Sequence, residues 1–214
     1  MSALRVLILD FDGVVIESND VKTEAFRKVF ARFPEHAEAM MTFHHAHVSV
    51  SRFAKFEHLL RLIGKTGDTA FMAEIAADFS SRVLHAMEAV PLVLGAETLL
   101  RSLTPLLPVY LASVTPAEDL DVILTRRGLK HWFRDVYGCP PWTKPDAIRD
   151  LLAHEGVNPD EALLIGDSAG DQRAAQITGV KFLARDSGLS FDSPAPLIFT
   201  GLHEITHYLE NLLP

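Results

Sequence analysis

The apolar positions along this chain follow two patterns, which predict two kinds of secondary structure. Short apolar runs bounded by polar residues indicate buried strands, and longer segments with apolar residues three and four apart indicate amphipathic helices. The two patterns alternate over much of the chain, which is typical of a parallel sheet with helices on both faces. The predicted strands are residues 4–9, 109–112, 162–165, 180–183 and 197–199, and the predicted helices are residues 116–127, 144–155, 171–178 and about 203–212.

The alternation is interrupted between residues 16 and 90, where only the helical pattern occurs. Three groups of apolar residues recur there at helical spacing, and Asn19 or Asp20 is placed to cap the first helix. The pattern therefore predicts an α/β domain of residues 1–15 and 91–214 with a doubly wound, Rossmann-like parallel sheet. It also predicts a small helical domain of residues 16–90, inserted after the first strand.

The composition narrows the classes of function. The 214 residues include 20 Lys and Arg and 28 Asp and Glu, so the net charge is −8. A chain with this balance offers no basic surface for nucleic acid or an anionic membrane. A single cysteine, Cys139, excludes an internal disulfide and suits a reducing compartment. No apolar run approaches the roughly 20 residues that span a bilayer, and the first run is too short for a signal peptide. We expect a cytoplasmic protein that binds neither nucleic acid nor membrane.

Two aspartates follow the first predicted strand, where a purely structural strand would not place them. Burying an unpaired carboxylate costs several kcal/mol, yet Asp10 and Asp12 directly follow a buried run. Their spacing of two directs both side chains the same way, and Gly13 permits a tight turn. Ligands of doubly wound sheets bind beyond the carboxyl ends of the strands, where further polar side chains are expected. These are Ser113, Asp167 and Asp171, together with Lys144 at the predicted start of a helix.

In their order along the chain, these residues resemble the four motifs of the haloacid dehalogenase superfamily of hydrolases. Residues 10–14 resemble the first motif, Ser113 the second, Lys144 the third, and Asp167 with Asp171 the fourth. The helical insert lies where that family carries its small mobile cap. The resemblance implies the branch that contains phosphoglycolate phosphatases and β-phosphoglucomutases, with residues 16–90 as the cap.

The resemblance also implies a reaction and a cofactor. In the family, the first Asp attacks phosphorus and forms an aspartyl-phosphate, and Asp10 matches that position. The second Asp protonates the leaving oxygen and later takes a proton from water, and Asp12 matches it. The implied cofactor is Mg²⁺, held by carboxylates of Asp10 and Asp167 and by the backbone carbonyl of Asp12. The other residues that the resemblance places in the site are Ser113, Lys144, Asp171 and Ser168. Ser113 would contact the phosphoryl group, Asp171 would hold a metal-bound water or orient Lys144, and Ser168 would support the site.

Two departures from the family pattern leave the subfamily open. Val14 replaces the Thr that often follows the glycine, which removes a hydroxyl near the turn. The stretch after Lys144 has one proline, Pro145, and lacks the second that is common there. Neither change removes a catalytic group.

Two other motifs have simpler interpretations. Residues 203–207 read His-Glu-x-x-His, the zinc-protease pattern, but a third protein ligand is normally needed and nothing obvious supplies one. As the terminal helix of this fold, the segment should lie far from the catalytic edge. Residues 64–66 read Gly-Lys-Thr, yet Leu59 stands where a phosphate-binding loop needs its first glycine. We interpret that stretch as the end of a helix.

The insert contains two groups of basic residues. His44, His45 and His47 lack the spacing of a known metal site, so a polar loop is the simpler interpretation. Arg52 and Lys55 lie one helical turn apart and most often would form a solvated face. In a cap, they could instead bind a second anionic group of the substrate.

The leading hypothesis is a Mg²⁺-dependent phosphatase that hydrolyses a small phosphorylated metabolite. The alternative is a phosphomutase resembling β-phosphoglucomutase, which shares the four motifs and a helical cap. A dehalogenase is disfavoured because such enzymes lack the second acid, which here is Asp12. A binding module on a retired enzyme fold would be expected to lack a motif residue, and none is lacking. The pattern does not name the substrate, the cap residues that select it or the oligomeric state.

Overall fold

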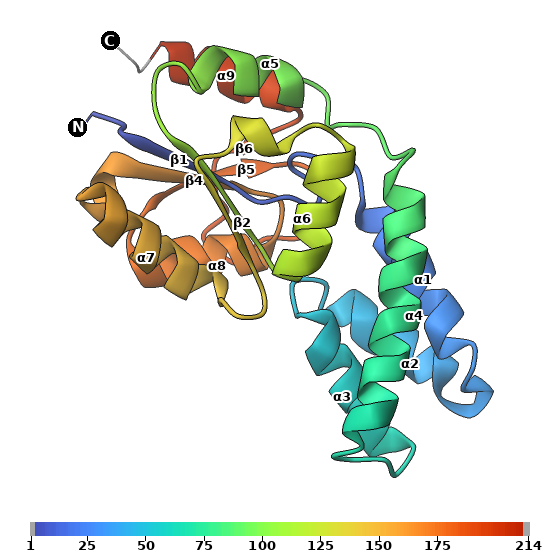
Figure 1. Ribbon diagram of the computed structural model, residues 1–214. Helices are drawn as coiled ribbons and strands as arrows, with labels where there is room; N and C mark the ends of the chain where they lie inside the picture. Colours follow the sequence, from blue (N-terminus) through green and yellow to red (C-terminus); the bar gives the residue numbers. More distant parts are fainter. Residues whose placement is uncertain (1–2, 212–214) are drawn as a thin grey trace. The chain divides into compact units, whose positions relative to one another are not determined.

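The computed structural model describes residues 3–211, which form two compact units. One unit consists of residues up to Glu17 together with residues from Val90 onward, and the other is Ser18–Ala89. The first unit has a parallel sheet in the order β3-β2-β1-β4-β5-β6 (Figure 1). Its strands are β1 (Val6–Leu9), β2 (Val109–Ser113), β3 (Asp135–Gly138), β4 (Ala162–Gly166), β5 (Lys181–Arg185) and β6 (Ile198–Phe199).

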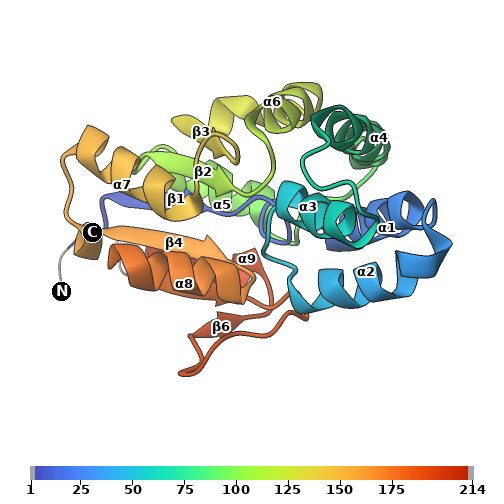
Figure 2. The same cartoon turned by 90° about the horizontal axis from the view of Figure 1, so that it is seen from below.

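Helices cover both faces of this sheet, which confirms the predicted doubly wound α/β fold (Figures 1 and 2). One face packs on α7 and α8 through a core that includes Ile8, Tyr110, Ile148 and Leu164. On the other face, α5 packs against α9. Strands with two covered faces carry near-continuous apolar sequence, and β1 and β4 are buried at every position. The helices are α5 (Ala96–Leu103), α6 (Ala117–Arg126), α7 (Lys144–Glu155), α8 (Ala169–Thr178) and α9 (Leu202–Glu210).

Sequence reasoning missed two elements of this unit. Strand β3 has too few apolar residues to stand out, because it contributes only Val136 and Tyr137 to the pattern. Helix α5 does carry a helical stripe, since Ala96, Leu99, Leu100 and Leu103 are buried at intervals of three and four. The elements predicted for this unit are all present. The ends of the predicted helix 144–155 match those of α7, and the ends of the other elements are shifted by at most two residues. The last residue of the final predicted helix, residue 212, lies outside the described residues.

The second unit is a bundle of four helices in the described chain: α1 (Asn19–Phe30), α2 (Pro34–Ala46), α3 (Arg52–Leu62) and α4 (Thr69–Met87). Its core contains a cluster of phenyl rings. The ring of Phe26 lies 4.3 Å from that of Phe79 and 5.8 Å from that of Phe56, measured between centroids. Edge and tilted contacts of this kind stabilise aromatic cores beyond their buried area. No helix of the described chain is both long and apolar enough to cross a membrane.

Two predictions for this segment were wrong. Asn19 is the first residue of α1 rather than its cap, and Ser18 at the cap position makes no side-chain hydrogen bond to the helix. The segment with the three histidines is not a polar loop, because His44 and His45 belong to α2 and His44 is buried. The missed signal was Pro34, which is the first residue of α2 and a favourable one at that position.

Candidate active site

The carboxyl ends of β2, β1 and β4 bring the predicted polar residues to one edge of the sheet. Leu9 of β1 is level with Leu111 of β2 and with Ile165 of β4. The chain therefore leaves all three strands at the same edge, where the strand order turns back on itself and ligands of such sheets bind. The residues placed there are Asp10, Asp12, Ser113 and Asp167, and all four are buried.

Lys144, the first residue of α7, supplies the positive charge of this site. Its Nζ lies 2.8 Å from Asp10 Oδ1 and donates a hydrogen bond to Asp171 Oδ1. Burial alone would lower the pKa of Lys144, but the adjacent carboxylates of Asp10 and Asp171 raise it above its usual range. The lysine is therefore a fixed ammonium between two acids.

The start of α8 holds Asp171 in place. Its Oδ2 accepts hydrogen bonds from the backbone N–H groups of Asp167 and Ser168, at 3.2 and 3.1 Å, and from Ser168 Oγ at 2.6 Å. Ser168 is the N-cap of α8 and accepts in return from the N–H of Asp171. One oxygen of Asp171 accepts hydrogen bonds at the start of α8, and the other faces Lys144. Of the two roles expected for Asp171, holding a metal-bound water or orienting Lys144, this arrangement suits the second.

A second buried group surrounds Asp12. Thr115 Oγ1 donates a hydrogen bond of 2.9 Å to Asp12 Oδ2, and Ser113 Oγ lies 3.5 Å from the same oxygen. The backbone N–H of Thr115 donates to Ser113 Oγ at 3.1 Å, which fixes the serine. Thr115 was missed in the sequence, although its place two residues after Ser113, just beyond the end of the predicted strand, was a usable signal.

The acids at this edge fit a divalent cation. Asp10, Asp167 and Asp171 each offer a carboxylate oxygen, and these oxygens lie within 4.8 Å of one another. Asp10 Oδ1 is buried and accepts no well-aligned hydrogen bond from the described residues, although it faces the Lys144 ammonium. Burial, then the negative charge of Asp171, raises the pKa of Asp10 well above its usual range, while Lys144 opposes the shift. A hard cation would compensate this excess of negative charge, and an all-oxygen donor set is what such ions prefer.

The two basic residues predicted as a pair on α3 have different surroundings. The interpretation as a solvated face is wrong for Lys55, which is 2% exposed. Its Nζ lies 3.1 Å from His44 Nδ1 and donates to the Val48 carbonyl at 3.2 Å, so it is engaged inside the insert. The guanidinium of Arg52 lies over the ring of Phe79 at 5.5 Å.

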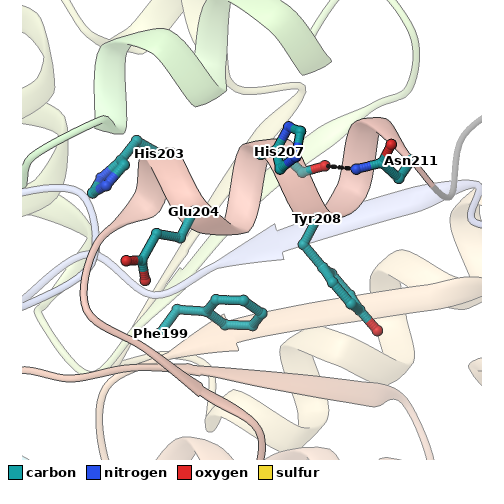
Figure 3. A pocket seen from close by; sticks show the side chains of 6 residues that line it. All are labelled: Phe199, His203, Glu204, His207, Tyr208 and Asn211. Atoms are coloured by element: carbon teal, nitrogen blue, oxygen red, sulfur yellow. Dashed lines mark hydrogen bonds between the residues drawn. The ribbon is translucent and has the colours of Figure 1, made fainter.

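The His-Glu-x-x-His segment forms part of α9 and lines a surface pocket with Phe199, Tyr208 and Asn211 (Figure 3). His203 and His207 point in different directions there. Glu204 accepts hydrogen bonds from the N–H and hydroxyl of Thr200, so it serves the start of the helix. Among residues 3–211, the acidic residues that lie close enough together to hold a metal ion are Asp10, Asp167 and Asp171, and none of them belongs to this segment. The structure gives no support to a zinc site here.

The chain is similar to known proteins over most of its length. A family model described as "Haloacid dehalogenase-like hydrolase" matches residues 7–185. Over 204 residues, the chain is 28% identical to a phosphoglycolate phosphatase of Rhodospirillum rubrum, and the match covers 90% of this chain and 84% of that protein.

Two solved structures share the fold at low sequence identity. A predicted phosphatase from Clostridium acetobutylicum is 19% identical with a TM-score of 0.78, covering 99% of this chain and 100% of that one. CbbY from Rhodobacter sphaeroides, solved in complex with phosphate, is 17% identical with a TM-score of 0.74, covering 94% and 96%.

Proposed function

Because the chain belongs to the haloacid dehalogenase-like hydrolase family, we propose that it is a Mg²⁺-dependent phosphatase of a small phosphorylated metabolite. The observation that carries this proposal is the buried arrangement in which Lys144 faces Asp10 while hydroxyl groups face Asp12. The two aspartates thus have different partners, as expected for a nucleophile and a proton carrier. The 28% identity to a phosphoglycolate phosphatase supports a phosphomonoester as the substrate class.

In the proposed reaction, an oxygen of Asp10 attacks the phosphorus and forms an acyl phosphate bond as the bond to the leaving oxygen breaks. Asp12 gives its proton to that leaving oxygen, so the product departs as an alcohol. In the second step, Asp12 removes a proton from water, which attacks the phosphorus and releases phosphate and the free Asp10 carboxylate. Ser113 and backbone N–H groups of the turn after β1 hold the phosphoryl oxygens.

The proposed Mg²⁺ ligands are the carboxylates of Asp10 and Asp167 and the backbone carbonyl of Asp12. When bound, the ion would offset the negative charge that the carboxylates and the phosphate dianion bring together. Lys144 contributes a second positive charge at Asp10, and Asp171 keeps that lysine oriented. Because the metal ion and Lys144 would each offset part of the negative charge, one edge of the sheet can carry four buried acids.

We further propose that residues 16–90 act as the cap and select the substrate. Of the two basic residues first considered as contacts for an anionic group, Arg52 is the one that we retain, because it is half-buried whereas Lys55 is buried inside the insert. The single cysteine supports the expected cytoplasmic location.

A substrate screen tests this proposal. Purified protein is assayed for phosphate release from phosphoglycolate, sugar phosphates, nucleotides and p-nitrophenyl phosphate, with Mg²⁺ or with excess chelator. We expect Mg²⁺-dependent release from at least one small phosphomonoester, and the Asp167→Asn variant should need a far higher Mg²⁺ concentration. Full activity in chelator would refute the metal assignment. Isomerisation of a sugar phosphate without net phosphate release would identify a phosphomutase instead.

A further inference from the structure

Arg185 is a buried arginine that belongs to none of the four motifs. It is the last residue of β5, two strands from β1 in the sheet, and it is 9% exposed. Its Nη1 donates hydrogen bonds to the Gly13 carbonyl at 3.1 Å and to Glu17 Oε2 at 3.0 Å, and its Nη2 donates to Glu17 Oε1. A buried guanidinium with three such bonds is held in one position by a bidentate carboxylate.

Both acceptors lie in the segment that follows Asp10 and Asp12, Gly13 in the turn itself and Glu17 just beyond it. Gly13 directly follows Asp12, has a positive φ of 72° and donates from its N–H to the Ile16 carbonyl at 2.8 Å. Glu17 is the last residue of the α/β unit before the chain enters the second unit, Ser18–Ala89. Its N–H donates to the carbonyl of Pro91, where the chain has returned from the insert, at 3.0 Å. The guanidinium therefore joins the end of the aspartate turn to the paired segments at the base of the insert.

We infer that Arg185 is a positioning residue for the reaction: it fixes the turn that carries Asp12 and ties that turn to residue 17. The expected effect on catalysis rests on the proposed function. The expected effect on the turn rests on the hydrogen bonds alone. The turn presents both the side chain and the backbone carbonyl of Asp12, so a small displacement would misplace a proton carrier and a metal ligand together. Lysine could not replace the arginine fully, because an ammonium lacks the planar fork that grips Glu17.

The test compares Arg185→Gln, Arg185→Lys and Glu17→Gln with wild type. The matched control is Arg173→Gln, because Arg173 pairs with Asp192 on the surface of the same unit and is 52% exposed. Two quantities are measured: kcat and KM for p-nitrophenyl phosphate with Mg²⁺, and hydrogen exchange of peptides covering residues 11–17 and 90–93 without metal.

We expect Arg185→Gln to lower kcat by about 10- to 100-fold with little change in KM, since misplacement by an ångström can cost that much. Exchange should rise in the two peptides and stay at the wild-type rate in β2 and β4. Arg185→Lys and Glu17→Gln should show the same pattern to a smaller degree, and Arg173→Gln should match wild type.

Two results would overturn the inference. One is wild-type kcat and wild-type exchange in Arg185→Gln. The other is faster exchange across the whole sheet with a proportional loss of folded protein, which is what a general stabilising role predicts. If wild-type protein hydrolysed no phosphomonoester, the proposed function would fail, while the exchange measurement would still decide whether Arg185 fixes the turn.

Discussion

Asp12 has the most demanding task in the proposed mechanism, because its carboxyl group must give up a proton in one step and accept one in the next. Its side chain must therefore stay in line with the leaving oxygen through both steps. Val14 is buried and offers no hydroxyl on the near side of the turn. The nearer hydroxyl to Asp12 Oδ2 comes from Thr115, beyond the end of β2, at 2.9 Å, against 3.5 Å for Ser113. In the proposed mechanism, Thr115 therefore orients Asp12.

Thr115→Val should therefore weaken the first chemical step, since it keeps the shape of the side chain and removes the hydrogen bond. A hydrogen bond to a charged group contributes about 1.5–3 kcal/mol, which corresponds to a loss of roughly 10- to 100-fold in rate. An alkyl phosphate should show this loss, because an alkoxide needs the proton as its bond breaks. In pre-steady-state assays, p-nitrophenyl phosphate should lose much less, and Thr115→Ser should stay near wild type. Equal losses with both substrates would show that Thr115 does not act through Asp12.

The residues of the site differ in how far the sequence could predict them. Asp10, Asp12 and Asp167 stand directly after apolar runs, so their gathering at one edge followed from the rule that parallel strands end together. Arg185 had no comparable signal. Its partners Gly13 and Glu17 are 172 and 168 residues away along the chain, and such a contact depends on strand order.

Among the elements, α8 has a structural task at its first turn and, in the proposed mechanism, a catalytic one. Ser168 caps the helix, and its hydroxyl donates to Asp171, whose other oxygen holds Lys144. Replacing a serine N-cap by alanine typically costs about 1 kcal/mol. Asp68 is an N-cap of the same kind on α4, where its side chain accepts from Phe71 N–H at 2.9 Å.

Ser168→Ala and Asp68→Ala should each lower the free energy of unfolding by about 1 kcal/mol in urea titrations. Only Ser168→Ala should also lower kcat, because it removes a donor from Asp171 and so loosens the orientation of Lys144. If kcat is unchanged in Ser168→Ala, or if both variants lose it equally, the first turn of α8 does not control Lys144.

In the insert, α2 and α3 enclose the ammonium of Lys55, which forms no ion pair with a carboxylate of residues 3–211. The Lys55 Nζ faces His44 Nδ1 and the Val48 carbonyl, and it lies 4.8 Å from the centre of the Phe26 ring. Burial, with a smaller contribution from the charge of Lys22, lowers the pKa of Lys55 to about 7. Burial and the charge of Lys55 lower the pKa of His44 to about 3.

Both shifts make the insert more stable as the pH rises. Unfolding returns Lys55 to a pKa near 10.5, so the unfolded chain binds more protons than the folded one between about pH 7 and pH 10.5. The gain across that window is about 5 kcal/mol, since each pKa unit corresponds to about 1.4 kcal/mol. His44 acts in the same direction between about pH 3 and pH 6.5. Urea unfolding of the insert, followed by hydrogen exchange in α2 and α3, should show greater stability at about pH 9 than at pH 7.

Lys55→Met should largely remove the difference between pH 7 and pH 9. Lys28→Met is the matched control, because Lys28 is 56% exposed beside Glu24 on the same unit, and it should leave the difference unchanged. An unchanged pH dependence in Lys55→Met would mean that the buried ammonium is not the group that titrates.

At the scale of the whole molecule, the chemistry and the proposed selection of substrate belong to different parts of the chain. The α/β unit supplies every acid of the site together with Lys144, Ser113 and Thr115. The alternation of strands and helices made that unit predictable, because parallel strands covered on both faces leave a strong apolar signal. The insert was predictable only as helical, since its helix α2 has few buried apolar residues and two basic side chains, His44 and Lys55, are buried.

The central claim is that hydrolysis proceeds through a phosphorylated Asp10. Wild-type protein is mixed with substrate and Mg²⁺, quenched in acid within one turnover, digested and analysed by mass spectrometry, with Asp10→Asn as the control. We predict one phosphate on Asp10 of the wild type and none on the variant, which should also lose turnover because an amide is a far poorer nucleophile. Phosphate on Ser113 or on a histidine, or turnover by Asp10→Asn at the wild-type rate, would contradict the mechanism.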